Sequence, residues 1–538
     1  MIDGALQPYG LTLDKFLDHA AKWHPQAEVV TAREGREPDR IGYAALRDRA
    51  RRISTLLAGF GIGQGDRVAT LAWNSQAHLE CWYAIIGMGA VCHTLNPRLT
   101  ATELADMLRQ SEAKVLVVTA ELAELAAGTL ECGANVDEVL LIDCDDVVPA
   151  DTLDAAVLET LIADDTPGTE WGAFDENAPC GLCFTSGTTG APKGVTYTHR
   201  GSYLHTLRQL QADVSGIVAT DSILVAVPMF HANAWGLPFS APAAGAKLVL
   251  PGRETTGEAL ARLIESERVT LGVAVPTVWL TLYDYLDETG MRLPSLERIM
   301  VGGAPMPPAL ARRIEDSGVR VQTSWGMTEL SPLGTASAPS ASAGEAGHSG
   351  RPAIGIDLLL ADPEGNALDR QRGSEGHLLV RGHSVVERYF GDRESACDNG
   401  WFPTGDLAVI DEDGNLSITG RSKDLIKSGG EWINPAVIEA LIGALPQVSH
   451  AAVIARPDEK WGERPLLVVE MRDSDPIGER DLRAALDGKV ARWWIPDEIR
   501  RIDAMPLAAT GKIDKLRLRR EYSTASAGKR PSIAPRIP

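Results

Sequence analysis

The chain of 538 residues is short of positive charge. Its 52 lysine and arginine residues are outnumbered by 73 aspartate and glutamate residues, which gives a formal net charge of −21. Nucleic-acid binding depends on basic side chains that neutralise phosphates, so this composition argues against nucleic acid as a partner. It does not exclude a small anionic ligand, because a few backbone N–H groups can supply local positive potential.

Long apolar runs are also missing. No run reaches the length of about 18 residues that a membrane-spanning helix needs. Residues 1–23 lack the basic and apolar regions of a secretory signal peptide. We therefore expect a cytoplasmic protein without a membrane span.

Cysteine is scarce, and its seven residues are scattered along the chain. An odd, scattered set is typical of reduced thiols. Cys180 and Cys183 form a C-x-x-C motif, but no second pair with metal-binding spacing accompanies it. Because the motif lies in an apolar run that reads as a buried strand, core packing is favoured over a redox or metal role.

What the chain has in quantity is an alternation of short apolar runs with stretches of helical spacing. Residues 49–57 have helical periodicity, and residues 67–71 read as a strand. Continuous apolar runs typical of strands buried on both faces occur at residues 115–118, 139–142, 222–227, 247–250, 271–275 and 298–301. Strands separated by helices predict an α/β fold with parallel sheets covered by helices on both faces.

The pattern changes after about residue 350, where Gly, Asp and Glu turns separate short strands. It predicts a β-rich subdomain over residues 350–422, which completes a large N-terminal domain of residues 1–422. The polar stretch 420–424 is a candidate hinge. Residues 423–523 predict a small α+β C-terminal domain, and residues 524–538, rich in Pro, Ser and Ala, predict a disordered tail.

A loop rich in glycine and hydroxyl groups follows the apolar run 180–184. It reads Thr185-Ser186-Gly187-Thr188-Thr189-Gly190-Ala191-Pro192-Lys193-Gly194. Glycines let the backbone approach an anion, hydroxyl and N–H groups donate to phosphate oxygens, and Lys193 adds positive charge. The spacing differs from that of a P-loop. Taken alone, the loop could equally be a flexible turn.

The loop resembles the signature of the acyl-adenylate-forming superfamily: acyl-CoA synthetases, nonribosomal peptide adenylation domains and luciferases. Further segments match that family's motifs in the same order, and the similarity runs from about residue 15 to residue 520. Trp325 replaces the tyrosine that is commoner in the central motif. The matching segments are residues 228–235, 301–305, 324–329, 401–406, 420–424 and 506–512.

The resemblance implies a set of ATP-binding residues. They are Thr185, Ser186, Gly187, Thr188, Thr189, Gly190, Lys193, Gly303, Ala304, Pro305, Ser324, Trp325, Gly326, Met327, Thr328, Asp406 and Arg421. Asp406 would accept hydrogen bonds from the ribose hydroxyls, and Arg421 would fix the same sugar. Singly, each of these residues could be an ordinary turn or surface residue, but their order along the chain favours the functional interpretation.

The same resemblance implies the catalytic and metal-binding residues. Glu329 and Thr185 would hold Mg²⁺, a hard cation that prefers oxygen ligands and substrate phosphates. Lys512 would contact the substrate carboxylate and the α-phosphate, where a cation stabilises charge on the transferring group. His231 is a candidate for gating the thiol channel, although a packed histidine is the simpler alternative.

The acyl and thiol sites follow from the resemblance as well. Trp235 and Gly302 would line the acyl pocket. Lys423 would be the hinge about which a mobile C-terminal domain rotates, withdrawing Lys512 and presenting a coenzyme A-binding segment. That segment comprises Lys427, Ser428, Gly429, Gly430, Glu431 and Trp432.

Together these features predict an ATP-dependent carboxylic acid–CoA ligase that forms acyl-AMP and then acyl-CoA. Its partners would be a small carboxylic acid, ATP and coenzyme A, and a homodimer is left open. The segments 228–238 and 427–433 resemble most those of medium-chain fatty-acyl-CoA and methylmercaptopropionate-CoA ligases, which favours short- or medium-chain fatty or thioether acids. The alternatives are an adenylation enzyme that loads an aryl or fatty acid onto a carrier-protein thiol, a luciferase-like oxygenase and a non-catalytic nucleotide-binding regulator.

Overall fold

The computed structural model describes residues 3–144, 153–162, 168–185, 192–340, 347–429, 431–472, 477–508 and 512–522. The chain forms two compact units. Unit 1 comprises residues 1–374, 378–404 and 409–417, and unit 2 comprises residues 375–377, 405–408 and 418–538. Phosphate-loop residues Ser186, Gly187, Thr188, Thr189 and Gly190, and Gly430 of the coenzyme A-binding segment, lie outside the described residues.

The first sheet of unit 1 has nine strands. From edge to edge they are β16 (Arg351–Pro352), β15 (Leu333–Ala336), β14 (Arg320–Gly326), β13 (Arg298–Val301), β12 (Leu271–Ala274), β10 (Ser222–Val225), β11 (Lys247–Leu250), β1 (Glu28–Thr31) and β2 (Asp39–Gly42). The six strands from β14 to β1 pair in parallel, whereas β2, β15 and β16 add antiparallel edges.

The second sheet of unit 1 has seven strands. In order they are β7 (Ala156–Val157), β6 (Glu138–Ile142), β5 (Val115–Thr119), β3 (Arg67–Leu71), β4 (Val91–Leu95), β8 (Pro179–Thr185) and β9 (Lys193–Thr198). All neighbours are parallel except β8 and β9, which form an antiparallel pair on either side of the phosphate loop. The loop therefore connects two hydrogen-bonded strand ends.

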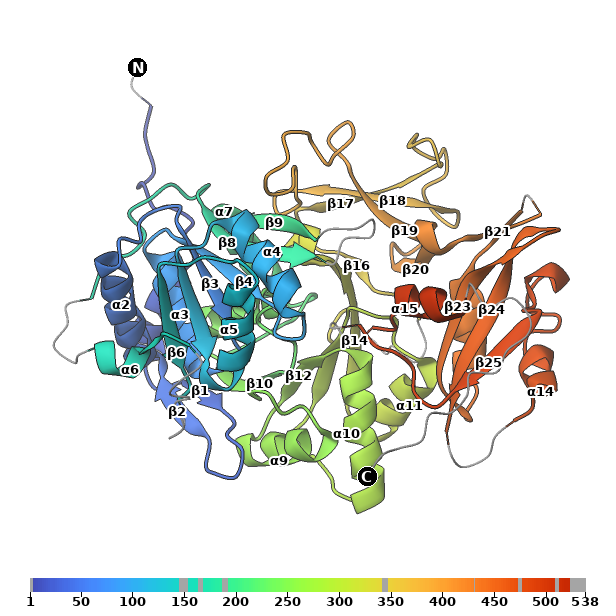
Figure 1. Cartoon of the computed structure of the whole chain (residues 1–538), viewed down its shortest axis with the longest axis horizontal. Helices are drawn as coiled ribbons and strands as arrows, with labels where there is room; N and C mark the ends of the chain where they lie inside the picture. Colours follow the sequence, from blue (N-terminus) through green and yellow to red (C-terminus); the bar gives the residue numbers. More distant parts are fainter. Residues whose placement is uncertain are drawn as a thin grey trace. The chain divides into compact units, whose positions relative to one another are not determined.

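Helices precede or connect the strands of both sheets (Figure 1). They are α1 (Asp14–Trp23), α2 (Tyr43–Gly59), α3 (Gln76–Gly87), α4 (Ala101–Ser111), α5 (Ala123–Glu131), α6 (Leu158–Leu161), α7 (His199–Gln209), α8 (Leu237–Ala244), α9 (Gly257–Glu267), α10 (Pro276–Thr289) and α11 (Pro308–Asp316). Short 3₁₀ turns η1 (Ala120–Leu122), η2 (Ala232–Gly236) and η3 (Thr328–Leu330) interrupt the connections. Two of these turns, η2 and η3, carry predicted site residues.

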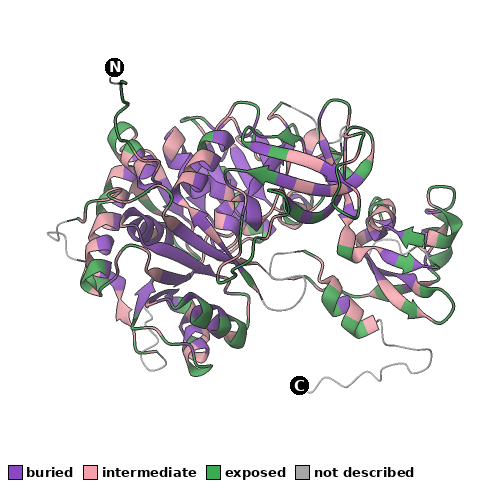
Figure 2. Cartoon of the chain, turned by 90° about the horizontal axis from the view of Figure 1, so that it is seen from above, coloured by how far each residue is buried: buried purple, intermediate pink, exposed green. Residues whose placement is uncertain are grey.

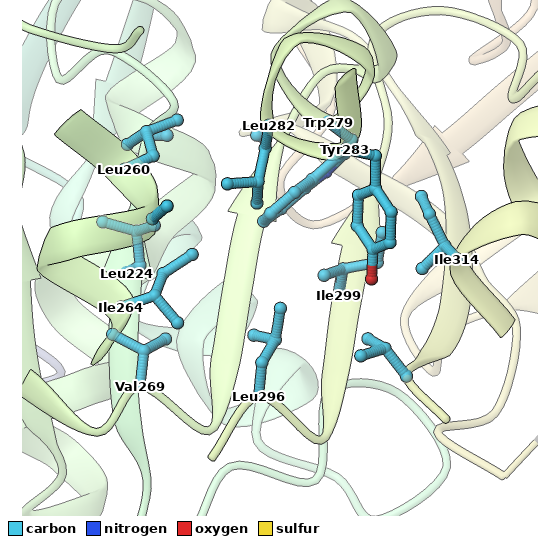
Figure 3. Close-up of a cluster of buried hydrophobic side chains, with 14 of the residues drawn as sticks. Leu224, Leu260, Ile264, Val269, Trp279, Leu282, Tyr283, Leu296, Ile299 and Ile314 are labelled. Carbon is cyan, nitrogen blue, oxygen red and sulfur yellow. The ribbon is translucent and has the colours of Figure 1, made fainter. Parts of the chain in front are cut away.

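A hydrophobic core joins the nine-stranded sheet to α9, α10 and α11 (Figure 3). Trp279 of α10 is fully buried and lies so close to β12 that a Cβ atom on Gly272 would fall 2.3 Å from its ring. Leu224 and Ile299 contribute from the sheet, and Leu260 contributes from α9. Figure 2 shows that buried residues follow the strands of unit 1, whereas exposed residues lie on outer helical faces and loops.

A four-stranded sheet has the order β17 (Ile356–Ala361), β18 (Glu375–Gly382), β19 (Phe402–Ile410) and β20 (Leu416–Arg421), and the boundary between the units falls within its strands. Unit 2 has a further sheet, with β22 (Glu431–Ile433), β21 (Ile426–Ser428), β24 (Gly462–Met471), β23 (Val448–Asp458) and β25 (Glu498–Ile502). Its helices and turns are η4 (Ser422–Asp424), α13 (Pro435–Gly443), α14 (Glu479–Ala484), η5 (Arg492–Trp494) and α15 (Lys515–Tyr522).

The α/β fold expected from the sequence is confirmed. Cys180 and Cys183 are buried in β8 with free thiols, and no cluster of three or more potential metal ligands occurs among the described residues. Within the same residues, no helix is both long and apolar enough to cross a membrane. The domain boundary at residues 422–423 and the disordered tail of residues 524–538 stay predictions, and the tail lies outside the described residues.

Candidate active site

The carboxyl ends of β13 and β14 bring three predicted site residues together. Ser324 Oγ donates to the carbonyl of Val301 at 3.0 Å. A Cβ atom on Gly302 would lie 2.7 Å from Ser324 Oγ and 3.0 Å from Cη2 of the Trp235 indole, so only glycine fits there. Ligands of open α/β sheets bind at this edge, beyond the carboxyl ends of the strands. Gly303, Ala304 and Pro305 follow at positions that solvent reaches.

Glu329 lies in η3, directly after β14, and is only 8% exposed. The Tyr389 hydroxyl donates to Glu329 Oε1 at 3.0 Å, and the Val386 N–H donates to the Glu329 carbonyl at 2.7 Å. Burial, and then the Glu329 charge, raise the pKa of Tyr389, so this phenol remains a hydrogen-bond donor at neutral pH.

Tyr389 also connects Glu329 to the phosphate loop. Lys193 Nζ lies 4.8 Å from the centroid of the Tyr389 ring, which is within the range of a cation–π contact. The Phe390 N–H donates to the Gly194 carbonyl at 2.8 Å. Tyr389 and Phe390 therefore link the last residues of the phosphate loop to the candidate metal carboxylate, although these segments are far apart in the sequence.

Thr185 is the other predicted metal-binding residue, and it ends β8. It pairs with Lys193 across the β8–β9 ladder, and its hydroxyl lies 3.5 Å from the Lys193 carbonyl. Mg²⁺ typically takes one or two protein carboxylates or hydroxyls and completes its shell with substrate phosphates and water. One buried carboxylate at Glu329 and one hydroxyl at Thr185 fit that donor set.

The other residues of the central motif are held by their backbone. The Tyr197 hydroxyl donates to the Thr328 carbonyl at 3.0 Å, and the Met327 N–H donates to the Pro332 carbonyl at 3.0 Å. The Trp325 ring packs against β15, where a Cβ atom on Gly334 would lie 2.6 Å from it. Gly326 passes so close to Pro332 that it too cannot carry a side chain.

Trp235 lies in a left-handed turn. Asn233, Ala234 and Trp235 have φ values of 54°, 46° and 55°, and Ala232 before them has a φ of 44°. Each non-glycine residue in this region costs roughly 1–2 kcal/mol, with asparagine the most tolerant of them. Tertiary contacts must therefore hold the turn. His231, half-buried, precedes it and accepts a hydrogen bond from the Ala234 N–H at 3.2 Å through its carbonyl.

Asn74 is a positioning residue that the sequence did not reveal. Its Nδ2 donates to the carbonyls of Val225 and Val227 at 2.9 and 2.8 Å, and its Oδ1 accepts from the Met229 N–H at 2.7 Å. One amide thus joins the end of β3 to the segment that leads into His231. The signal was a polar residue shortly after a buried strand, at the edge where sites form.

Arg208 of α7 donates hydrogen bonds to the residues that flank η3, the turn that carries Glu329. It is 1% exposed, and its guanidinium donates to Ser384 Oγ at 3.1 Å and to the Leu333 carbonyl at 2.7 Å. Ser384 Oγ in turn donates to the Leu330 carbonyl at 3.1 Å. Burial lowers the pKa of Arg208 to about 10, so it remains charged at neutral pH. No carboxylate pairs with it among the residues that the structure describes.

We expect Arg208→Ala to lower the free energy of unfolding by about 3 kcal/mol, because it removes two buried hydrogen bonds and leaves a cavity. Arg208→Lys should lose less, since one ammonium can reach one of the two acceptors but lacks the fork that reaches both. Urea denaturation followed by circular dichroism measures both variants. Equal stability of the alanine variant and the wild type would contradict a supporting role for Arg208.

In unit 2, Asp406 and Arg421 lie together. Arg421 Nε is 2.7 Å from Asp406 Oδ1, and the Asp406 side chain is 1% exposed whereas that of Arg421 is 39% exposed. A carboxylate fixed by a partly exposed guanidinium can present its other oxygen to a diol. The structure therefore brings together the two residues that the resemblance implies for ribose binding.

The predicted hinge residue Lys423 follows in η4. Burial lowers the pKa of Lys423, and the neighbouring cations Arg421, Arg519 and Lys515 act in the same direction, against Asp424. Asp424 forms an ion pair with Arg519 of α15 at 2.7 Å. This ion pair links the predicted hinge to α15, the helix that follows the Lys512 loop.

Lys512 and the predicted coenzyme A-binding segment both belong to unit 2. Lys512 is exposed, and its carbonyl accepts from the Ala508 N–H at 2.6 Å next to the bridge between Leu507 and Ile513. β21 and β22 form a hairpin in which Lys427 opposes Trp432 and Ser428 opposes Glu431. Gly429 has a φ of 61°, and a Cβ atom there would lie 2.8 Å from the Trp461 ring.

Comparison with known families identifies two matching regions. Residues 17–390 match the model of the AMP-binding enzyme family, and residues 437–512 match that of the AMP-binding enzyme C-terminal domain. The first match alone covers more than half of the chain.

Curated relatives and solved structures agree with that match. The chain is 40% identical to a 3-methylmercaptopropionyl-CoA ligase of Ruegeria lacuscaerulensis, over 98% of this chain and 100% of the relative. It is 39% identical to a medium-chain-fatty-acid–CoA ligase of Ectopseudomonas oleovorans, over 96% of this chain and 97% of the relative. The ATP-bound structure of MatB from Rhodopseudomonas palustris superposes with a TM-score of 0.84 at 27% identity, covering 96% of this chain and 99% of that one. The chain belongs to the AMP-binding enzyme family, in its acyl-CoA synthetase branch.

Proposed function

We propose that this chain is an AMP-forming acid–CoA ligase for short- or medium-chain fatty or thioether acids. The observation that supports the proposal is the contact chain from Lys193 through the Tyr389 ring to the buried Glu329 carboxylate, which links a phosphate-loop cation to an acidic side chain. This arrangement suits a nucleoside triphosphate with its metal ion, because Lys193 would meet phosphate charge and the Glu329 carboxylate would hold the metal.

In the first half-reaction, a carboxylate oxygen of the acid attacks the α-phosphorus of ATP. The bond from that phosphorus to the bridging oxygen breaks, and pyrophosphate leaves with its electron pair. Lys193 and Lys512 would stabilise the added negative charge, and Asp406 with Arg421 would hold the ribose. Mg²⁺, held by Glu329 and Thr185, would neutralise phosphate charge when bound.

In the second half-reaction, a thiol sulfur attacks the acyl carbon, the thiol proton is lost, and AMP leaves. We propose coenzyme A as that thiol because both curated relatives are named as CoA ligases. The glycine-containing hairpin at residues 427–432 gives a narrow pantetheine arm close access to the backbone. Lys423 would be the residue about which the two half-reactions exchange their catalytic groups.

The acid is proposed from the pocket and from the relatives. The Trp235 indole closes against Gly302, and a bulky ring at that place shortens the space for an acyl tail. The two relatives are named for 3-methylmercaptopropionate and for medium-chain fatty acids. One methylene changes binding by only about 1–3 kcal/mol, so a graded preference among neighbouring chain lengths is expected.

A substrate panel tests the proposal. Butyrate, hexanoate, octanoate, 3-methylmercaptopropionate and benzoate are each incubated with ATP, Mg²⁺ and coenzyme A, and AMP and acyl-CoA are quantified. We expect equal amounts of both products with the aliphatic acids. AMP without acyl-CoA would favour a carrier-protein thiol as acceptor, and no acid-dependent AMP at all would favour a nucleotide-binding regulator.

We expect Lys423→Pro to uncouple the two half-reactions, since proline fixes φ at the proposed hinge and removes its N–H. Pyrophosphate exchange reports adenylation, and acyl-CoA formation from supplied acyl-AMP reports thioester formation. One rate should fall at least about tenfold more than the other. Unchanged rates for both steps would contradict the hinge role of Lys423.

A further inference from the structure

Gln209, the last residue of α7, is 1% exposed and lies against the left-handed turn. Its Nε2 donates to the Trp235 carbonyl at 3.0 Å. Its Oε1 accepts from Ser240 Oγ of α8 at 3.2 Å. A buried amide normally satisfies both of its ends, and here the two ends connect three elements that carry or flank the acyl pocket.

The orientation of this amide follows from its partners. A flipped side chain would set Oε1 against the Trp235 carbonyl, so that two acceptors would face each other. Gly236 packs against the same amide, since a Cβ atom there would lie 3.0 Å from Gln209 Oε1. The donor to the Trp235 carbonyl is therefore Nε2 of Gln209.

The turn needs such a contact because its own sequence does not favour it. Alanine and tryptophan rarely adopt a positive φ, yet Ala234 and Trp235 both do. Gln209 donates a hydrogen bond to the Trp235 carbonyl, and Gly302 leaves room for the Trp235 indole. If the hydrogen bond from Gln209 is lost, we expect the backbone to relax and the indole to turn away from Gly302.

We propose that Gln209 is a specificity-determining positioning residue, which sets the acyl-chain preference by holding the Trp235 turn in its left-handed form. The proposal rests on the proposed function and deepens it. Gln209 touches no reacting atom in this scheme and acts only through Trp235. Without its hydrogen bond the indole no longer limits the pocket, so longer acids gain relative to shorter ones.

The test compares Gln209→Met with the wild type, since methionine keeps the length of the side chain and removes its donor. Pyrophosphate exchange gives kcat/KM for octanoate and for butyrate. We expect the octanoate-to-butyrate ratio to rise about tenfold, the effect of losing one hydrogen bond to a buried acceptor, with an unchanged KM for ATP. Gln211→Met is the matched control, because that residue lies two positions further on, and its ratio should not change.

A double variant separates positioning from general damage. In the Trp235→Ala background, Gln209→Met should change the ratio less than about twofold, because the group through which it acts is gone. An equal fall for both acids, or a full effect in the Trp235→Ala background, overturns the proposal. If the wild-type protein showed no acid-dependent pyrophosphate exchange, the result would instead contradict the proposed function.

A measurement without substrate tests the positioning of Trp235 by Gln209 separately from the proposed function. In protein labelled with 5-fluorotryptophan, the ¹⁹F resonance of Trp235 is assigned by its loss in Trp235→Phe, and that of Trp325 by its loss in Trp325→Phe. Gln209→Met should shift or broaden the Trp235 resonance and leave the Trp325 resonance in place, whereas Gln211→Met should move neither. An unmoved Trp235 resonance in Gln209→Met overturns the inference.

Discussion

Glu329→Gln is expected to lower kcat for adenylation by about 10²–10³-fold, the loss typical of removing one preorganised electrostatic group. Glutamine keeps the volume of the side chain and an oxygen that can accept from Tyr389, so the η3 turn should persist. What disappears is the negative charge that would hold Mg²⁺ next to the phosphates. We therefore expect the variant to keep its fold while adenylation becomes much slower.

Acid-dependent pyrophosphate exchange, measured over a range of Mg²⁺ concentrations, checks this result. The variant should need more Mg²⁺ for half-maximal rate than the wild type. Glu131→Gln, the same change at an exposed position of α5, is the matched control and should behave as the wild type. Exchange at the wild-type rate and Mg²⁺ dependence would remove Glu329 from the metal site.

Tyr389→Phe tests the orientation of the Glu329 carboxylate without removing its charge. It removes the hydroxyl that donates to Glu329 Oε1 but keeps the ring beneath Lys193. Its effect should therefore be smaller than that of Glu329→Gln.

The strands could be predicted closely from the sequence because parallel strands buried on both faces are continuous apolar runs. The predicted ranges 67–71, 247–250 and 298–301 coincide with β3, β11 and β13. The predicted range 222–227 was too long, since β10 ends at Val225. The carbonyls of Val225 and Val227 accept from Asn74 instead of continuing the ladder, and that interaction comes from 151 and 153 residues away in sequence.

Site residues could be predicted from the sequence where they belong to one short, continuous motif. Glu329 was found because it ends a continuous motif. Tyr389, which donates to it, lies 60 residues later in a turn-rich segment without a distinctive pattern. Gln209 was missed for the same reason, since a glutamine at a helix end reads as an exposed residue until α8 and the Trp235 turn are packed against it.

The left-handed form of the Trp235 turn was not predictable at all. Its residues Ala232, Asn233, Ala234 and Trp235 favour other backbone conformations, with asparagine the partial exception. Local preference and tertiary structure disagree there, and such disagreements concentrate at functional sites.

Lys512→Ala is expected to have the largest effect of the changes considered, with a fall of about 10³-fold in adenylation and a change of at most a few-fold in thioester formation from supplied acyl-AMP. A cation that stabilises charge on the transferring phosphoryl group contributes only to the first step. Lys512 is exposed, so its truncation should leave thermal stability unchanged.

Two controls make the result specific. Lys512→Arg keeps the positive charge, but on a planar guanidinium, and should recover part of the adenylation rate. Lys489→Ala removes another exposed lysine of unit 2 and should change neither step. If Lys512→Ala slowed both steps equally, the residue would serve the loop between Leu507 and Ile513 rather than the chemistry. A selective loss of pyrophosphate exchange assigns Lys512 to the adenylation step, because only that step involves displacement at the α-phosphorus.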